Sequence, residues 1–348
     1  MNISIIGTVG VPACYGGFET LVENLLDDNS KSNEFTIYCS AKSYDEKIKN
    51  YKNAELVYLP LKANGIQSVP YDIWSILHSV FIRKSKKILI LGVSGAICLP
   101  FVRLFSKAKI VTNIDGLEWK RDKWGAWAKR FLKFSENLAV KHSDIIVADN
   151  RGIADYVTSE YEIKSEVIAY GGDHAIVQEL NDCDEDYALA LCRIEPENNV
   201  ELILESFSRT SRNLKFIGNW DNSEYGKSLK SYYSQFSNIE IIDPIYDVHK
   251  LFLIREACKF YVHGHSAGGT NPSLVEMMHF KKPILAFDCN YNRASTEEKA
   301  YYFSDCNDLI KLIKSPEKAS NGKDMKEIAQ RKYTWDIVKQ QYLDLFDE

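Results

Sequence analysis

The chain has 348 residues, which suits two domains of ordinary size that each bury a core. Its hydrophobic content of 45% and charged content of 26% are typical of a soluble globular protein. The net charge of −5 argues against a nucleic-acid-binding protein, because such binding depends on a basic surface. No apolar run approaches the roughly 20 residues that span a bilayer. The first residues enter a strand pattern without a basic leader, so we expect neither a membrane-spanning helix nor a signal peptide.

The eight cysteines are scattered along the chain. No Cys-x-x-Cys pair and no Cys/His spacing typical of zinc ligands occurs in the sequence. Cys192 and Cys258 lie in apolar runs, where a reduced cysteine behaves as a small hydrophobic residue. The cysteine pattern therefore predicts no zinc site and favours a reducing, cytoplasmic environment.

Strand-sized apolar runs alternate with helical patterns along the first half of the chain. Continuous apolar runs such as 88–91 and 145–148 indicate parallel strands that are covered on both faces. This alternation is typical of a doubly wound α/β domain. We expect strands near 2–6, 34–39, 55–59, 87–91, 109–112, 144–148 and 165–169, and helices near 18–29, 71–84, 124–141 and 150–159.

A glycine-rich loop follows the first expected strand. Gly7, Gly10, Gly16 and Gly17 lie between that strand and a helical pattern that starts near Phe18. Their spacing does not match the dinucleotide fingerprint G-x-G-x-x-G. Two consecutive glycines before a helix allow a ligand to approach the backbone closely, although a purely structural turn would use them as well.

The alternation restarts after a polar, acidic and glycine-led stretch. We therefore expect a first domain at 1–172, a linker at 173–186 and a second domain at 187–332, with a C-terminal helix at 333–348 that can pack back on the first domain. In such α/β domains ligands bind beyond the carboxyl ends of the strands, so two facing domains place the site in the cleft between them. In the second domain we expect strands near 187–192, 214–218, 239–242, 258–262, 283–287 and 301–303, and helices near 199–210, 225–236, 247–256, 272–280, 305–314 and 322–332.

The most informative segment is 269–280. Thr270 and Asn271 precede a helix that opens at Pro272, a position that proline favours because its missing N–H would be unpaired there. Backbone N–H groups at such a helix start can bind an anion. Glu276, one turn further, is placed to accept hydrogen bonds from ribose hydroxyls. The alternative is an ordinary helix start with a solvated glutamate.

Other polar residues follow strands of the second domain. Arg193 lies between a strand and a helix, where its guanidinium suits a diphosphate, although a surface salt bridge is the alternative. Asn219 ends the next strand, and the segment 241–247 ends another in a proline-containing turn. The ends of these strands could frame a base and a sugar.

Metal ligands are not indicated. His263 and His265 share a strand end, but no acidic or cysteine partner stands at a suitable spacing. The string D-x-D, which metal-dependent transferases of another fold use, occurs at 182–184 and 184–186. Both copies lie in the expected linker, where a solvated acidic tract is the simpler interpretation.

At this point the sequence resembles family 4 glycosyltransferases of the GT-B fold over essentially its whole length. The closer resemblance is to a rhamnosyltransferase-like subgroup of bacterial capsule and O-antigen synthesis. It implies two Rossmann-like, doubly wound domains that face each other across a cleft. The motifs that carry the resemblance are at 7–20, 113–124, 192–207, 218–226 and 263–284.

The resemblance implies a nucleotide-diphospho-sugar donor held mainly by the second domain. Arg193 would bind the diphosphate and Glu276 the ribose, while the turn at 268–271 would face the transferred sugar. Gly16 and Gly17 would approach the phosphate and sugar from the first domain. The donor residues implied in this way are Gly16, Gly17, Arg193, Asn219, Ile245, Tyr246, His265, Gly269, Thr270, Asn271 and Glu276.

Two positions depart from the broad family. The first of its two paired glutamates is replaced by Gly268, and the lysine that follows the diphosphate-binding arginine is replaced by Asn198. The subgroup shows similar substitutions, so they do not argue against activity. They leave part of the sugar contacts and the second phosphate cation unassigned.

Asp115 follows a strand of the first domain and is the candidate catalytic carboxylate, together with Arg193. It could orient or deprotonate an acceptor hydroxyl, or serve only in a turn. The resemblance implies a reaction that retains the anomeric configuration, in which the donor phosphate helps to take the acceptor proton. It implies neither a cofactor nor a metal, because arginine and helix N-termini stabilise the departing diphosphate.

The segment 119–134 interleaves cations with aromatic residues. Such a stripe suits an anionic membrane surface, although a packed helix with a solvated basic face is the alternative. We expect a cytoplasmic enzyme on the inner face of the membrane that uses a polyprenyl-diphosphate-linked acceptor. The residues expected at the membrane or acceptor are Lys120, Arg121, Lys123, Trp124, Trp127 and Arg130.

The function expected from this resemblance is transfer of a sugar, with L-rhamnose from dTDP-L-rhamnose as the first choice. Three alternatives remain. The chain could use a UDP- or GDP-sugar, it could be a GT-B sugar-nucleotide epimerase that needs no acceptor, or it could be a non-catalytic nucleotide-sugar-binding subunit.

Overall fold

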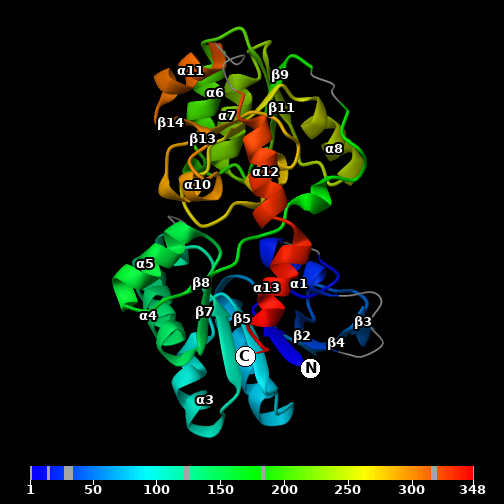
Figure 1. Cartoon of the computed structure of the whole chain (residues 1–348), viewed down its shortest axis with the longest axis vertical. Helices are drawn as coiled ribbons and strands as arrows, with labels where there is room; N and C mark the ends of the chain where they lie inside the picture. Colours follow the sequence, from blue (N-terminus) through cyan, green and yellow to red (C-terminus); the bar gives the residue numbers. More distant parts are fainter. Residues whose placement is uncertain are drawn as a thin grey trace. The chain divides into compact units, whose positions relative to one another are not determined.

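The computed structural model describes residues 2–13, 16–26, 34–120, 125–181, 185–314 and 320–347. They form two compact units. Figure 1 shows the chain coloured from blue at the N-terminus to red at the C-terminus. Unit 1 contains Met1–Ala169 and Val338–Glu348, and unit 2 contains Tyr170–Ile337.

Within the described residues, unit 1 is built on an eight-stranded sheet with the order β3-β4-β2-β1-β5-β6-β7-β8. The central strand β1 (Ile3–Ile6) pairs in parallel with β2 (Phe35–Ser40) and β5 (Lys87–Leu91). Every residue of β1 and β2 is buried, which explains why apolar residues predominate in both strands, although Ser4, Thr36 and Ser40 are buried with them. The remaining strands are β3 (Asn50–Tyr51), which is antiparallel to its neighbour, β4 (Ala54–Leu59), β6 (Lys109–Asn113), β7 (Ile145–Ala148) and β8 (Glu166–Val167).

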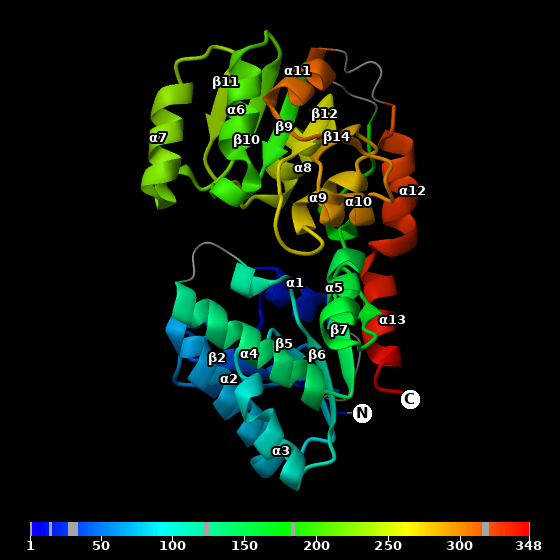
Figure 2. The same cartoon turned by 90° about the vertical axis from the view of Figure 1, so that its left-hand side faces the viewer.

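The helices of unit 1 cover both faces of this sheet. Right-handed crossovers put the helices that follow β4, β5, β6 and β7 on one face, and Figure 2 shows three of them, α2, α3 and α4, together. The connection from β1 to β2 runs in the opposite direction along the sheet, so its helix, α1, covers the other face. The helices are α1 (Gly16–Leu25), α2 (Ser68–Leu77) with a π-helical extension η2 (His78–Ile82), η3 (Ala96–Cys98) with α3 (Leu99–Phe105), α4 (Ala126–His142), α5 (Arg151–Tyr161) and α13 (Trp335–Asp344).

The described part of unit 2 contains a six-stranded parallel sheet with the order β11-β10-β9-β12-β13-β14. Its core brings Phe207, Phe216, Trp220 and Phe260 together between the sheet and its helices. The strands are β9 (Tyr187–Leu191), β10 (Asn213–Ile217), β11 (Ile239–Ile242), β12 (Phe260–His263), β13 (Ile284–Phe287) and β14 (Tyr301–Phe303). The helices are α6 (Val200–Ser208), α7 (Glu224–Tyr233), α8 (Val248–Ala257), α9 (Pro272–Met278), α10 (Asn290–Ser295), α11 (Cys306–Lys314) and α12 (Gly322–Lys332).

Both sheets are doubly wound, as the sequence predicted. The chain winds outward from β1 in one direction and from β5 in the other, and it does the same from β9 and β12 in unit 2. A doubly wound sheet binds ligands at the carboxyl ends of the strands where the winding reverses. We therefore expect functional residues at the carboxyl ends of β1 and β5 in unit 1 and of β9 and β12 in unit 2.

Among the strands and α-helices of the described residues, three were not predicted from the sequence. They are the short strand β3 and the helices α3 and α10. The helix α3 has only seven residues, and apolar side chains occur on its outer face as well as its inner face, so the sequence shows no amphipathic period there.

Candidate functional site

Arg193 lies at the carboxyl end of β9, where the winding of the unit 2 sheet reverses. Its side chain is 52% exposed. Nη1 of its guanidinium lies 3.9 Å from Oε1 of Glu195, with which it forms an ion pair. An ion pair at this distance and exposure is weak. The guanidinium is therefore available to bind a second anion with both of its outer nitrogens.

Asn198 fixes the loop that carries Arg193. Its side-chain Nδ2 donates to the carbonyl oxygen of Arg193 at 2.7 Å, and its Oδ1 lies 2.7 Å from Nδ1 of His265. Because Nδ2 is the donor of this amide, Oδ1 is the acceptor and Nδ1 of His265 carries a proton. The buried Asn198 therefore links the ends of β9 and β12 at the position where the broad family has lysine.

Asn219, at the carboxyl end of β10, holds the same loop from the other side. Its Oδ1 accepts a hydrogen bond of 2.7 Å from the backbone N–H of Ile194. A Cβ at the preceding Gly218 would lie 2.9 Å from the backbone carbonyl oxygen of Cys192 and 2.3 Å from Cδ1 of Ile194, so a larger residue there would require both to shift. Asn219, placed among the donor contacts by resemblance, thus also orients the residue that follows Arg193.

The turn before α9 is glycine-rich and tightly packed. Gly268, in the place of the missing glutamate, has φ +109°, a conformation that other residues rarely adopt. Asn271 caps α9, because its Oδ1 accepts from the N–H of Ser273 at 3.0 Å and its carbonyl accepts from that of Leu274 at 3.1 Å. The N–H group of Val275 also donates to the carbonyl of Asn271, at 3.2 Å, so the three N–H groups that follow Pro272 are already bonded. An anion at this point would be held by the turn itself, which includes Gly269 and Thr270.

Glu276 stands at the centre of a polar network in unit 2. Its Oε2 pairs with the guanidinium of the buried Arg255 on α8, and its Oε1 lies 3.4 Å from Nε2 of His174. The indole N–H of Trp335 donates to Nδ1 of His174 at 2.9 Å. Because an indole nitrogen can only donate, Nδ1 of His174 is the acceptor and its Nε2–H faces the carboxylate.

This network keeps Glu276 ionised. Burial by itself would raise the pKa of Glu276, but Arg255 and His174 outweigh burial and lower the pKa below its ordinary value. Each carboxylate oxygen accepts hydrogen bonds in two directions, so the pairing with Arg255 leaves acceptor capacity for ribose hydroxyls. Arg255, His174 and Trp335 were not identified from the sequence, because no short spacing connects them to Glu276.

Two further residues implied by the resemblance follow β11. Tyr246 is 90% exposed, and Ile245 is partly buried. Both belong to the loop that precedes α8. Their expected contact with a base stays a prediction.

His263 is buried at the end of β12. Burial and the neighbouring His265 hold the pKa of His263 well below its ordinary value, so its imidazole is neutral. Its Nε2 has no hydrogen-bond partner among the described residues. No group of three or more potential metal ligands occurs in the part of the chain that the structure describes. The D-x-D string at 182–184 lies outside these residues.

In unit 1 the loop after β1 is fixed by a buried carboxylate. Oε1 of Glu19, in the first turn of α1, accepts hydrogen bonds from Oγ1 of Thr8 at 2.8 Å and from the N–H of Val9 at 2.6 Å. Burial raises the pKa of Glu19. α1 starts at Gly16, whose φ is +77°, and continues through Gly17. Glu19 was not identified from the sequence, although a carboxylate in the first helical turn is a known anchoring signal.

Asp115 follows β6 at the same edge of the unit 1 sheet. Its backbone is left-handed, with φ +59°, and its N–H donates to Oδ1 of Asn113 at 2.8 Å. Aspartate tolerates this conformation better than most residues. Asn113 in turn donates to the hydroxyl of Tyr342 on α13 at 2.7 Å. Asp115 therefore occupies a fixed turn, and its carboxylate remains the candidate acid–base group.

A second carboxyl group at this edge escaped the sequence analysis. Asp72 on α2 is buried and accepts a hydrogen bond at Oδ2 from the hydroxyl of Ser94, which follows β5. Its Oδ1 has no partner among the described side chains and backbone groups. Burial raises the pKa of Asp72 to about 7. The chain lacks a local motif around Asp72, so only its buried environment distinguishes it.

The stripe at 119–134 is partly packed and partly exposed. Trp119 donates from Nε1 to Glu136 at 3.0 Å, and Nζ of Lys133 lies 4.8 Å from the centroid of its ring. By contrast, Trp127 on α4 is 83% exposed and lies beside Arg130. Lys120 stands over the Trp119 ring, and Arg121, Lys123 and Trp124 lie outside the described residues.

Comparison with known proteins identifies the fold. Residues 1–173 match a family model described as a domain of unknown function, DUF1972. No curated protein matches the chain in sequence. A solved structure of sucrose-phosphate synthase from Thermosynechococcus elongatus is similar, with 14% identity, a TM-score of 0.78 and coverage of 99% of this chain and 98% of that chain.

Two other solved structures agree over the full length. Anabaena HepE in complex with UDP-glucose has 13% identity and a TM-score of 0.73, with 100% of this chain and 99% of that chain covered. The lipopolysaccharide outer core galactosyltransferase WaaB has 13% identity and a TM-score of 0.70, with 99% of each chain covered. The chain therefore has the fold of GT-B glycosyltransferases, which confirms the fold predicted from its motifs.

Among the described residues, none of the helices combines the length and the apolar character that crossing a membrane requires.

Proposed function

We propose that the protein is a glycosyltransferase that binds a nucleotide-diphospho-sugar at the carboxyl edge of the unit 2 sheet. The observation that carries this proposal is the position of Arg193. Its weakly paired guanidinium stands at the winding reversal, on a loop that Asn198 and Asn219 hold by hydrogen bonds. A fixed arginine at this edge suits a diphosphate, because its planar nitrogens match two phosphate oxygens.

The remaining donor contacts follow from the same edge. We assign the ribose to Glu276, which its network keeps ionised, and the transferred sugar to the turn of Gly268–Asn271 with His265. The base would lie against Ile245 and Tyr246. This assignment is supported by the placement of all these residues in loops after β9, β10, β11 and β12 or at the start of α9.

We propose L-rhamnose from dTDP-L-rhamnose as the donor, on the resemblance to the rhamnosyltransferase-like subgroup of family 4. A UDP-sugar is the second candidate, since the similar HepE structure contains UDP-glucose. Titration of a panel of nucleotide sugars, with the melting temperature as readout, distinguishes the two. The preferred donor gives the largest stabilisation, because ligand binding to the folded state raises its stability.

We assign the acceptor to unit 1, with Gly16 and Gly17 near the donor phosphate and Asp115 near the acceptor hydroxyl. The departing phosphate would help to take the acceptor proton, so that a strong dedicated base is not required. The reaction would retain the anomeric configuration and proceed without a metal. Arg193 would stabilise the negative charge that develops on the leaving diphosphate.

We further propose that the acceptor is a polyprenyl-diphosphate-linked saccharide and that the enzyme acts in the cytoplasm at the inner membrane surface. The exposed pair Trp127 and Arg130 supports a contact with lipid or acceptor on α4. Lys120, Arg121, Lys123 and Trp124 belong to the same proposed contact.

The decisive experiment compares Arg193→Ala with Arg209→Ala. The two arginines have equally exposed side chains, and each pairs with a glutamate. Arg209, however, follows the last residue of α6, away from the carboxyl ends of the strands. Nucleotide-sugar binding should weaken in Arg193→Ala alone, and equal binding by both variants would exclude the site. Product formation that requires a lipid-linked acceptor identifies a transferase. Product formation without an acceptor identifies an epimerase. Binding of the nucleotide sugar without turnover identifies a non-catalytic subunit.

A further inference from the structure

Two neighbouring helices of unit 1 expose apolar side chains at helical spacing. On α2 and η2, Phe81 and Ile82 lie seven and eight positions after Trp74. On η3 and α3, Phe101, Leu104 and Phe105 lie four, seven and eight positions after Ile97. Such spacings place side chains on one face of a helix. Their exposed fractions range from 38% to 77%, which is unusual for side chains of this size. They are Trp74, Phe81 and Ile82, and Ile97, Phe101, Leu104 and Phe105, which we call the aromatic surface.

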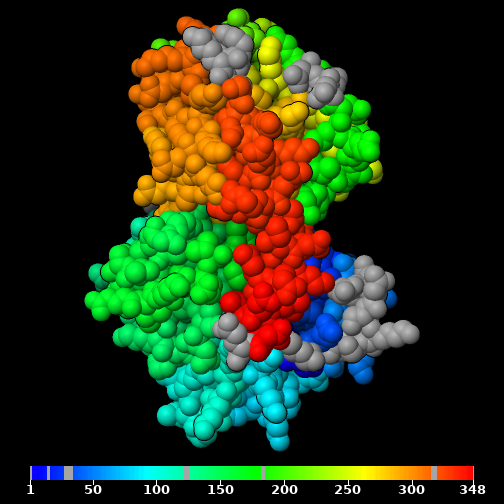
Figure 3. Space-filling view, in the orientation of Figure 1, coloured from blue at the N-terminus to red at the C-terminus, as the bar shows by residue number. Residues whose placement is uncertain are grey.

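The two rows meet at Phe81, Phe101 and Phe105. The ring centroid of Phe81 lies 6.1 Å from that of Phe101 and 6.0 Å from that of Phe105, and the latter two are 5.0 Å apart. In the space-filling view, α3 and the end of η2 both reach the surface of unit 1 (Figure 3). Contiguous apolar surfaces of this kind mark sites of interaction in folded proteins.

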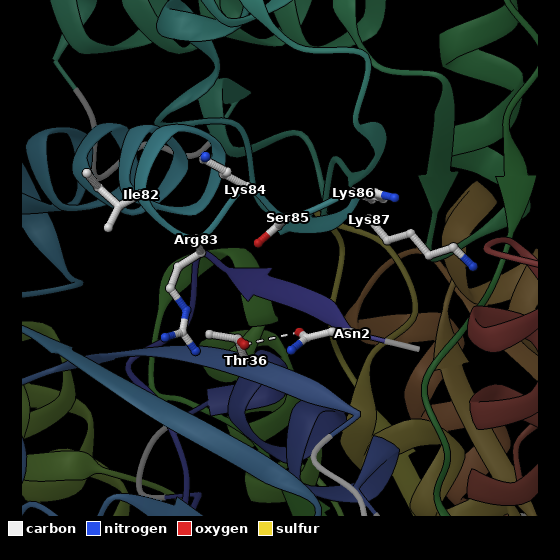
Figure 4. Close-up of a pocket in the computed structure, with 8 residues that line it drawn as sticks. All are labelled: Asn2, Thr36, Ile82, Arg83, Lys84, Ser85, Lys86 and Lys87. Carbon is white, nitrogen blue, oxygen red and sulfur yellow. Dashed lines mark hydrogen bonds between the residues drawn. The ribbon is translucent and has the colours of Figure 1, made fainter.

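A cluster of cations borders the aromatic surface. Ile82 of the aromatic surface and the four cations of residues 83–87 line a hollow of about 660 Å³, together with Asn2 and Thr36. Figure 4 shows Ile82 at one side of this hollow and Lys86 and Lys87 at the other. Arg83 pairs with Glu55, and Nζ of Lys87 donates to a backbone carbonyl. Lys84 and Lys86 are exposed, and so is Lys107, which follows α3. Lys84, Lys86 and Lys107 thus add positive charge beside the aromatic surface, although the net charge of the whole chain is −5.

We propose that the aromatic surface docks on a phospholipid bilayer that contains anionic lipids. Phe101, Leu104 and Phe105 enter the boundary between headgroups and acyl chains, as the apolar faces of interfacial helices do. Lys84, Lys86 and Lys107 bind the lipid phosphates. A bilayer satisfies both the apolar and the cationic parts of the surface, whereas a second copy of the chain would bring like charges together.

The cations and the end of this surface formed by Phe81, Ile82, Leu104 and Phe105 lie at the edge of the sheet opposite to Asp115. Lys86 and Lys87 come directly before β5 and Lys107 comes before β6, so they mark the amino-terminal edge, while Asp115 follows β6 at the carboxyl edge. Docking through that end, which carries Phe101, Leu104 and Phe105, leaves the carboxyl edge of unit 1 uncovered. The inference goes beyond the proposed transfer reaction, because lipid binding can be measured without donor or acceptor.

The test is cosedimentation of the full chain with vesicles of phosphatidylcholine alone and of phosphatidylcholine with phosphatidylglycerol. The parent protein should bind the anionic vesicles in a salt-sensitive manner. The variant Lys84→Gln/Lys86→Gln should bind them about thirtyfold more weakly, since each cation near an anionic surface contributes to binding. The variant Phe101→Ser/Leu104→Ser/Phe105→Ser should not sediment with either kind of vesicle.

Two control variants show whether the effect is local. Tyr232→Ser/Leu253→Ser removes comparably exposed apolar residues from unit 2 and should leave vesicle binding unchanged. Trp127→Ser/Arg130→Gln removes the exposed pair on α4, which this proposal assigns to the acceptor and not to the bilayer, and it should reduce binding far less than the α3 variant. Melting curves verify the fold of every variant. Leu104→Asp, at the most exposed position, replaces the triple variant if that one unfolds.

Three results would overturn the proposal. The parent protein could fail to bind anionic vesicles, the α3 variants could bind as the parent does, or Trp127→Ser/Arg130→Gln alone could abolish binding. A parent dimer that the α3 variants dissociate, without any vesicle binding, would show that the surface joins two copies. Stabilisation by nucleotide sugar should persist in the α3 variants, so failure of lipid docking and failure of the proposed function are distinguishable.

Discussion

The carboxylate of Glu276 on α9 pairs with the guanidinium of the buried Arg255 on α8 inside unit 2, and the two side chains are 14% and 6% exposed. Nε2 of His174 approaches the same carboxylate, and Trp335 fixes the orientation of that imidazole. A proposed ligand-binding residue is thus held by three side chains from distant parts of the sequence. Such support is what holds a binding group in one geometry before the ligand arrives.

The ion pair makes the stability of unit 2 dependent on acid pH. The folded-state pKa of Glu276 is lowered, so its contribution to stability is complete above the unfolded-state pKa of about 4.5 and is lost as the pH falls through the folded-state value. Glu276→Gln should lower the free energy of unfolding by about 3 kcal/mol at pH 7, because it leaves the Arg255 charge buried without its partner. The loss should shrink below pH 4. Urea denaturation across this range measures both effects.

An exposed carboxylate provides the control for this measurement. Glu224, at the start of α7, pairs with Lys227 and has a 91% exposed side chain. Glu224→Gln should change stability by less than about 1 kcal/mol at any pH. Equal effects of the two substitutions would contradict a buried role for Glu276.

The orientation of His174 predicts a more specific effect. In Trp335→Phe the indole donor is lost, so His174 can present either nitrogen to Glu276. We expect weaker nucleotide binding, by about tenfold, because the ribose-binding carboxylate is no longer fixed in one position. Calorimetric titration of nucleotide measures this loss. His174→Gln, which retains a donor toward Glu276, should restore part of the affinity in the Trp335→Phe background.

Arg193 carries the largest predicted effect on donor binding. A charge-assisted hydrogen bond contributes roughly 1.5–3 kcal/mol, so Arg193→Ala should weaken nucleotide binding about tenfold to hundredfold. The melting temperature without ligand should stay the same, because the side chain is half exposed. Arg193→Lys should recover only part of the affinity, since lysine cannot bind two phosphate oxygens with a planar group.

The sequence predicted the two parallel sheets because their strands are buried on both faces and therefore read as continuous apolar runs. It predicted Arg193, Asn219 and Glu276 as candidates because each stands beside a strand end or a helix start. It could not predict the link from Asn198 to His265, since these residues are 67 positions apart and meet only when β9 pairs with β12.

The helix α3 was missed for a different physical reason. Sequence periodicity reveals a helix when one face is apolar and the other polar. Phe101, Leu104 and Phe105 are exposed and apolar, so the outer face of α3 has the composition of an inner face. The same feature that hid the helix from the sequence makes its surface unusual in the structure.

Metal independence is the fourth prediction. Turnover should persist in excess EDTA, because the proposed charge stabilisation comes from Arg193 and backbone N–H groups. Measurement of product formation with and without chelator, followed by addition of Mg²⁺ or Mn²⁺, tests this expectation. Activity that disappears with chelator and returns with a divalent ion would show that a metal takes part.

Asp72 predicts a second pH dependence, of opposite sign to that of Glu276. Burial raises the pKa of Asp72 from 3.8 to about 7, so the protein is most stable while this group is protonated. Between these values Asp72 holds its proton more often in the folded than in the unfolded state, so its contribution to stability should fall as the pH rises. The loss amounts to at most about 4 kcal/mol, at about 1.4 kcal/mol for each pH unit of the shift. Asp72→Asn, which keeps an acceptor for the hydroxyl of Ser94, should remove this decline, whereas Asp155→Asn on the exposed face of α5 should preserve it. Urea denaturation of the three proteins between pH 5 and pH 8 measures the difference, and the same decline in Asp72→Asn would show that the carboxyl group of Asp72 does not cause it.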